Sequence, residues 1–242
     1  PAEWANEVFS SKVMFAKGWL RFGYLSEAIS DLDQAEELMR AEGDSLLSNQ
    51  AVADWHATMA SRYRQQRNLP SAIVHNKHAR DLVGLSANCP TCLAYLNDYA
   101  LILEDAHEYD HALQVLDAVI RLKSITTAWD DPVMAIYCNN IGHIYMRMHR
   151  FADAKKYFEF ASRILVASNR KNDAIISKIN LVSIARAEGD YKFVVQQAMA
   201  LIGELESLDA GQGAKIGTVW REIARAYAGL ALESGYASQS AS

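Results

Sequence analysis

Proline and glycine are scarce in this chain of 242 residues, which contains four prolines and twelve glycines. Folds rich in β-strands need many turns and usually contain more of both residues. The chain also has no run of 18 apolar residues, the length that would indicate a membrane-spanning helix. The sequence therefore favours an all-α fold without membrane insertion.

Basic residues are in the minority, because 24 lysines and arginines stand against 29 aspartates and glutamates, a formal net charge of −5. Binding to a nucleic-acid backbone needs a basic face that displaces counterions. We therefore expect no nucleic-acid partner. Half of the residues are hydrophobic, so the chain can bury a large core.

Motifs of catalysis are missing as well. The chain has no glycine-rich phosphate-binding loop and no HExxH of zinc enzymes. His75 and His78 lie three residues apart in a helical run, but no third ligand is evident, and we interpret them as two surface histidines. We expect no enzymatic activity, no cofactor and no metal site in this chain, although an enzymatic domain could lie outside it.

Cysteine is rare, and two of the three cysteines form a CxxC, at Cys89 and Cys92. One such pair does not make a zinc finger, because no second Cys/His pair follows at the required spacing. A disulfide in an oxidising compartment and two idle thiols both remain open. The disulfide would place the chain in the periplasm, whereas free thiols are also compatible with the cytoplasm. Cys138, in an apolar helical pattern, is expected to be a small buried residue.

Both ends of the chain look cut. It begins at Pro1 instead of methionine and ends in a small polar tail from Ala237 to Ser242. We expect a segment excised from a longer protein, with an output domain elsewhere in that protein.

What the sequence does contain is a repeat. Five times, a short polar turn is followed by a small residue, the anchor, which opens a run with helical apolar periodicity. The anchors are Ala28, Ala72, Ala112, Ala154 and Val194. Their spacings of 44, 40, 42 and 40 residues indicate a period of about 40.

Each anchor opens one helix and is preceded by another. Twelve residues before the anchor lies a residue of small or modest size, which lets two helices cross closely. These crossing residues are Ala16, Ala60, Ala100, Gly142 and Val182. Three residues further on comes a position whose side chain can fill the space beside the crossing. It is occupied by Trp19, Tyr63, Leu103, Tyr145 and Ala185.

The second helix of each pair continues the pattern, with Leu32, Leu116 and Phe158 four residues after the anchor on the same helical face. In the second repeat, Asn76 stands where a large apolar residue is usual.

This pattern resembles the tetratricopeptide repeat (TPR), most closely where Gly142 and Tyr145 are followed by Phe151, Ala154 and Phe158. The common TPR has about 34 residues. The longer period is similar to that of TPR arrays in bacterial signalling and regulatory proteins. The resemblance implies an all-α, right-handed α-α superhelix (a TPR solenoid) of about five helix pairs plus a sixth unpaired helix.

We expect one TPR array over residues 1–242. Its repeats are predicted at about 3–44, 45–86, 89–124, 130–169, 171–208 and, incomplete, 212–236. The unpaired sixth helix is expected to expose Ile223, Tyr227 and Leu230, which makes a homodimer possible.

The resemblance also implies a concave wall, made by the first helix of each pair, on which a partner binds. Asparagine and arginine recur at the positions that map to this wall, which also include Lys17 and Arg21 of the first repeat. An asparagine amide suits a peptide backbone because it donates and accepts hydrogen bonds, and arginine matches carboxylates. The predicted partner-binding residues are Arg64, Asn97, Asn139, Asn140, His143, Arg147, Asn180, Arg186, Arg221 and Arg225. In the alternative interpretation, these asparagines join neighbouring helices and these arginines pair with acidic residues of the wall.

The predicted function is a protein- or peptide-binding sensor or scaffold module. Its groove would bind an extended or acidic segment and regulate a separate output domain, such as a bacterial diguanylate cyclase or transcription regulator. Two alternatives remain open: a structural assembly and oligomerisation module, and a small-molecule sensor domain.

Overall fold

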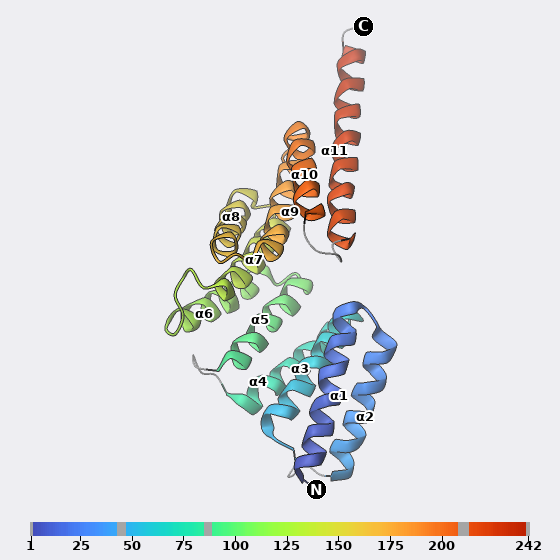
Figure 1. Cartoon of the computed structure of the whole chain (residues 1–242), viewed down its shortest axis with the longest axis vertical. Coiled ribbons are helices and arrows are strands. Elements are labelled where there is room, and N and C mark those ends of the chain that lie inside the picture. The colour runs from blue at the N-terminus through green and yellow to red at the C-terminus, as the bar shows by residue number, and fades with distance from the viewer. Residues whose placement is uncertain (1, 43–46, 85–88, 208–212, 241–242) are drawn as a thin grey trace. The chain divides into compact units, whose positions relative to one another are not determined.

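The computed structural model describes residues 2–42, 47–84, 89–207 and 213–240 (Figure 1). Throughout these ranges the regular secondary structure consists of α-helices only. The helices are α1 (Ala2–Phe22), α2 (Leu25–Glu42), α3 (Asn49–Gln65), α4 (Leu69–Val83), α5 (Pro90–Asp105), α6 (Tyr109–Ser124), α7 (Pro132–Arg147), α8 (Phe151–Ala167), α9 (Lys171–Ala187), α10 (Tyr191–Glu206) and α11 (Gly213–Ser240). In the described part of the chain, no helix is both long and apolar enough to cross a membrane.

The helices form the five predicted pairs of a TPR solenoid, with α11 as an additional helix. The chain divides into two compact units, which are Pro1–Thr127 with α1 to α6 and Ala128–Ser242 with α7 to α11. We call them unit 1 and unit 2. A single continuous array over all 242 residues remains a prediction.

The turn inside each pair is built in the same way five times. The residue five positions before the anchor has a positive φ angle, from 57° to 86°. These residues are Gly23, Arg67, His107, His149 and Gly189. The N–H of the next residue donates to the carbonyl oxygen five positions earlier, at 2.9–3.0 Å. This left-handed turn ends the first helix and redirects the chain into the second one.

The anchors form the centre of each pair, and all five are fully buried. Large and small side chains alternate around them. At Gly142, an added Cβ atom would lie 2.9 Å from the buried ring of Phe158. In unit 1, Ala16 and Leu32 occupy the equivalent positions in one core. The two residues that face each other at a helix crossing therefore have complementary volumes.

The last helix differs from the prediction in two ways. α11 continues to Ser240 instead of ending near position 236, and Ile223 is buried in a core with residues of α9 and α10. The prediction that Ile223 is exposed is wrong, because α11 packs on α10 through the face that carries Ile223. Tyr227 is exposed, as expected, and Leu230 is partly buried.

Candidate functional site

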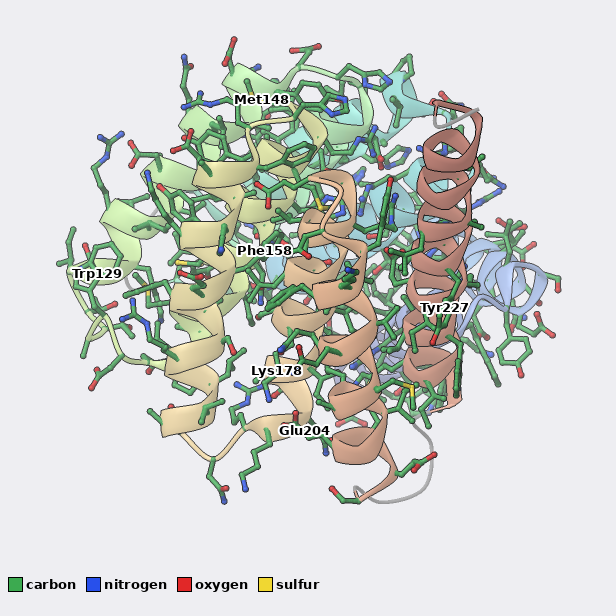
Figure 2. The ribbon with its side chains drawn as sticks, turned by 90° about the horizontal axis from the view of Figure 1, so that it is seen from above. Trp129, Met148, Phe158, Lys178, Glu204 and Tyr227 are labelled. Atoms are coloured by element: carbon green, nitrogen blue, oxygen red, sulfur yellow. A yellow bond between two sulfur atoms is a disulfide. The ribbon has the colours of Figure 1, made fainter. Side chains whose placement is uncertain are left out.

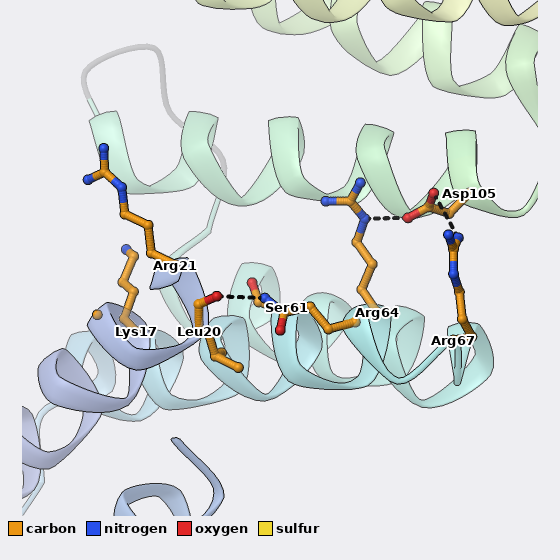
Figure 3. Close-up of a pocket in the computed structure, with 9 residues that line it drawn as sticks. Lys17, Leu20, Arg21, Ser61, Arg64, Arg67 and Asp105 are labelled. Carbon is orange, nitrogen blue, oxygen red and sulfur yellow. Dashed lines mark hydrogen bonds and ion pairs between the residues drawn. The ribbon is translucent and has the colours of Figure 1, made fainter. Parts of the chain in front are cut away.

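A pocket of about 690 Å³ opens in unit 1 on the wall formed by the first helices α1, α3 and α5 (Figure 3). Its lining carries four cationic side chains and one carboxylate, an excess of three positive charges. We call it the basic pocket, defined by Lys17, Arg21, Arg64, Arg67 and Asp105.

Asp105 organises one side of the basic pocket. Its Oδ2 atom accepts a hydrogen bond from Arg64 Nε at 2.5 Å, and its Oδ1 atom accepts one from Arg67 Nη1 at 3.3 Å. Both arginines are therefore held in place by a carboxylate from α5. Lys17 and Arg21 are exposed on α1, and neither forms an ion pair with any residue that the structure describes.

A second carboxyl, that of Asp98 on α5, lies next to Arg64 beside this pocket. Burial raises the pKa of Asp98, while the positive charges of Lys17 and Arg64 act in the opposite direction. Burial is the larger of these opposing effects, and Asp98 is a second acidic side chain beside the pocket, in addition to Asp105.

Of the predicted partner-binding residues, Arg64 lines the basic pocket, and Asn97 on α5 hydrogen-bonds to Asp98. Lys17 and Arg21, which map to the same wall, also line the pocket. Arg67 was not among the predicted residues, because it lies in the turn after α3 and the predicted wall consists of helical positions only.

In unit 2, several of the predicted residues join neighbouring first helices. Asn139 Oδ1 on α7 accepts a hydrogen bond from Ser177 Oγ on α9 at 2.9 Å. Glu222 on α11 is buried and pairs with Arg186 at 2.6 Å and with Arg225 at 2.9 Å. These contacts are those of the alternative interpretation, in which the polar residues of the wall connect helices.

The other predicted residues of unit 2 are spread along the same helices. Arg221 donates to Thr218 Oγ1 within α11 at 2.9 Å. Arg147 is exposed, and three further side chains are partly buried, namely Asn140, His143 and Asn180. Partner binding by these residues remains a prediction.

A histidine cluster joins α3 to α4. His56 Nδ1 lies 3.0 Å from His75 Nδ1, and the ring of His56 stacks on that of His78 with centroids 5.0 Å apart. Burial, followed by the charges of His75 and His78, lowers the pKa of His56 to about 4. His78 is exposed, as expected of a surface histidine, whereas His75 is partly buried because His56 packs against it from α3. Among the described residues, no group of three or more His, Cys, Asp or Glu side chains is arranged to hold a metal ion.

The cysteines occupy two different environments. Cys89 and Cys92 are joined by a disulfide at the start of α5, where the Cys89 sulfur also accepts a hydrogen bond from the N–H of Cys92 at 3.2 Å. Cys138 is buried in α7, and burial raises the pKa of its thiol to about 11. A thiol with such a pKa stays protonated and is a poor nucleophile.

The comparisons with known proteins identify the fold. No family model and no curated protein matches the sequence. Solved structures do match, among them the apo form of RapI, with a TM-score of 0.65 and 16% identity over 98% of this chain and 67% of that one. Kinesin light chain TPR-like repeats from Podosopora anserina match with a TM-score of 0.61 and 15% identity, over 82% of this chain and 96% of that one. PilF of Pseudomonas aeruginosa has a TM-score of 0.57 and 19% identity, over 96% and 93% of the two chains. The chain therefore has the TPR fold, as the sequence predicted.

Proposed function

We propose that this chain is a protein-interaction scaffold that binds an acidic segment of a partner protein in the basic pocket. The observation that carries the proposal is the excess of three positive charges around a 690 Å³ pocket, in a chain whose net charge is −5. A concentration of one charge sign against the sign of the whole chain favours a ligand of opposite charge.

The geometry suits carboxylates. Arg64 and Arg67 are already oriented by Asp105, so a ligand would immobilise fewer rotatable side chains on binding. Lys17 and Arg21 form no salt bridge with the described residues, although the charge of Lys17 acts on Asp98, so they can receive a ligand carboxylate without breaking a salt bridge. The planar guanidinium groups of the arginines can bind a carboxylate through two hydrogen bonds, and the flexible ammonium group of Lys17 can bind a second one.

We further propose that occupancy of the basic pocket regulates a separate output domain, as in a sensor or scaffold of the bacterial signalling type. The repeat architecture supports this role, because TPR-like arrays present extended concave surfaces. No catalytic step is assigned to this chain.

The proposal is tested by calorimetric titration with an acetylated, amidated peptide of alternating serine and glutamate, with glutamine replacing glutamate in the control peptide. The variant K17E/R21E reverses the two unpaired charges of the basic pocket. We expect it to bind the glutamate peptide at least about tenfold more weakly, a loss of about 1.4 kcal/mol.

The matched control is K77E/R121E, which makes the same change of charge at exposed positions of α4 and α6, outside the pocket. It should bind within about twofold of the native chain, because long-range screening weakens distant charges. Equal weakening in both variants, or no binding of the glutamate peptide by the native chain, would refute the proposal.

A second candidate function is assembly through α11. Trp220, Tyr227 and Leu232 on this helix are large and exposed, at 49%, 57% and 65% of their surface. Exposed apolar side chains on one element favour association. Sedimentation velocity distinguishes this candidate, because a chain that stays monomeric at high concentration does not assemble through α11.

A further inference from the structure

A second pocket, of about 380 Å³, lies in unit 2 between α8, α9 and α10. Its apolar part is lined by Leu181 and Ala185 of α9 and by Phe193 and Leu201 of α10. At its edge, Lys178 Nζ on α9 donates to both carboxylate oxygens of Glu204 on α10, each at 2.6 Å. Figure 2 shows these two side chains, from neighbouring helices, pointing toward each other. We call this site the apolar pocket.

The apolar pocket exists because one helix pair lacks side chains that other pairs have. Two positions face each other in a pair, one three residues after the crossing residue and one three residues after the anchor. In the pair α7–α8 they are Tyr145 and Tyr157, whose rings stack with centroids 5.6 Å apart. In the pair α3–α4 they are Tyr63 and His75, with centroids 5.3 Å apart.

In the pair α9–α10 the same two positions are Ala185 and Gln197, and both line the apolar pocket. Alanine is the smallest side chain found at the first of these positions, which elsewhere carries tryptophan, tyrosine or leucine. The space that a ring of the chain itself fills in α7–α8 is therefore open to a ligand in α9–α10.

Phe193 adds an aromatic wall to this space. It is 44% exposed although it lines the pocket, so its ring is available to a second ring from outside. Aromatic rings prefer edge-to-face or offset contacts with one another. An aromatic side chain of a ligand would therefore fill the space left by Ala185 and Gln197 and would contact the ring of Phe193.

The charges around the apolar pocket narrow the choice of partner. The lining has three glutamates and two lysines, and Lys178 is already paired with Glu204. The exposed Glu159 and Glu188 have no ion pair with any described residue, and neither does the exposed Lys155, so the lining has one excess negative charge. A basic residue on the ligand would compensate this excess charge.

We propose that the apolar pocket binds an aromatic side chain of a partner protein, flanked by basic residues. The site lies wholly in unit 2 and has no residue in common with the basic pocket. It therefore does not depend on the function proposed above, and either proposal can fail without the other.

The test is an NMR titration of the ¹⁵N-labelled chain with the capped peptide Ser-Lys-Phe-Lys-Ser and with Ser-Lys-Ala-Lys-Ser as its control. At about 5 mM, several times a Kd of about 1 mM, the phenylalanine peptide should shift amides of α9 and α10 near the pocket. No shift, or equal shifts with the alanine peptide, would overturn the proposal.

The variant A185Y/Q197Y installs the tyrosine pair of α7–α8 in the apolar pocket. Because this pair packs well elsewhere in the chain, we expect a folded protein that binds the phenylalanine peptide at least about tenfold more weakly. The control I176Y adds a tyrosine at an exposed position of α9 outside the pocket and should bind normally. Native-like binding by A185Y/Q197Y would contradict the assignment.

If circular dichroism shows that A185Y/Q197Y does not fold, A185L fills part of the same space with a residue that the third repeat carries at this position. Its binding should then weaken, and unchanged binding would count against the proposal. If free p-cresol shifts the same amides as strongly as the peptide does, the pocket binds a small aromatic ligand. This result would overturn the proposal of a protein partner.

Discussion

At the scale of single residues, the size of a side chain at a helix crossing is matched by the residue that faces it. Gly142 faces the ring of Phe158, whereas Ala16 and Leu32 share one core in unit 1. A smaller residue on one helix thus accompanies a larger one on the other, which keeps the interior closely packed.

We predict that Gly142→Ala destabilises the chain by about 1–3 kcal/mol. In an unobstructed helix this change would stabilise by up to about 1 kcal/mol, because alanine has the higher helix propensity. Here the new Cβ atom would lie 2.9 Å from a fully buried ring, which has little room to move. Urea unfolding followed by circular dichroism measures the difference.

The control for this prediction is Gly203→Ala in α10, where nothing lies within 4 Å of the added atom. It should leave stability unchanged or raise it slightly. Adding Phe158→Leu to Gly142→Ala recreates the alanine and leucine of the first repeat and should recover part of the loss. If Gly142→Ala and Gly203→Ala are equally stable, the ring of Phe158 does not restrict the size of residue 142, and the prediction is wrong.

At the scale of helices, the pairs were predictable because apolar periodicity and turn residues are local signals. The contacts between pairs were not. Asn76, in place of a large apolar residue, is fully buried, and its Nδ2 atom donates to the carbonyl oxygen of Tyr95 on α5 at 2.9 Å. Asn76 Oδ1 accepts a hydrogen bond from Arg80 Nε at 3.0 Å. The carbonyl that accepts from Asn76 belongs to the backbone of another pair, which no local pattern specifies.

The same limit applies to the candidate site. The sequence indicated which positions lie on the wall of first helices, and Lys17, Arg21 and Arg64 are found there together. Eight of the ten predicted partner-binding residues lie in α7, α9 and α11, where Arg186 and Arg225 instead pair with Glu222. Which cations remain unpaired depends on how side chains meet across helices, and this is a property of the packed structure.

The histidine cluster makes the packing of α3 on α4 sensitive to pH. The pKa of His56 is lowered to about 4 and that of His75 is also lowered, whereas both rings titrate near 6.5 when unfolded. Between these values the unfolded chain binds more protons than the folded one, so stability falls as the pH falls. Glu36 opposes and Arg62 reinforces the effect at His75.

We therefore predict that lowering the pH from 7 to 4.5 removes about 1–2 kcal/mol of stability through this cluster, a figure reduced for solvent screening because the rings are only partly buried. Melting of the native chain and of His56→Gln at both pH values measures it. His56→Gln should lose less stability on acidification, and His111→Gln, at an exposed position of α6, should behave like the native chain. The same pH slope in all three proteins would contradict the prediction.

At the scale of the whole molecule, two pockets of different chemistry coexist on one acidic chain. The basic pocket of unit 1 has three excess positive charges, while the apolar pocket of unit 2 has one excess negative charge at its rim. The apolar pocket arises from substitutions at equivalent positions of a common repeat. A regular scaffold thus offers two distinct ligand preferences. The proposed ligands accordingly differ in charge and in the force that would bind them.

This difference predicts opposite responses to salt. Raising NaCl from 0.1 M to 1 M shortens the screening length from about 10 Å to about 3 Å, so binding of the glutamate peptide to the basic pocket should weaken at least about tenfold. Burial of an aromatic ring is not screened by salt, so the phenylalanine peptide should weaken by no more than about threefold, mainly through its lysines. Titrations of the native chain with both peptides at the two salt concentrations measure these changes. An equal loss for both peptides would mean that charge alone governs binding at the two sites, and would contradict the distinction drawn between them.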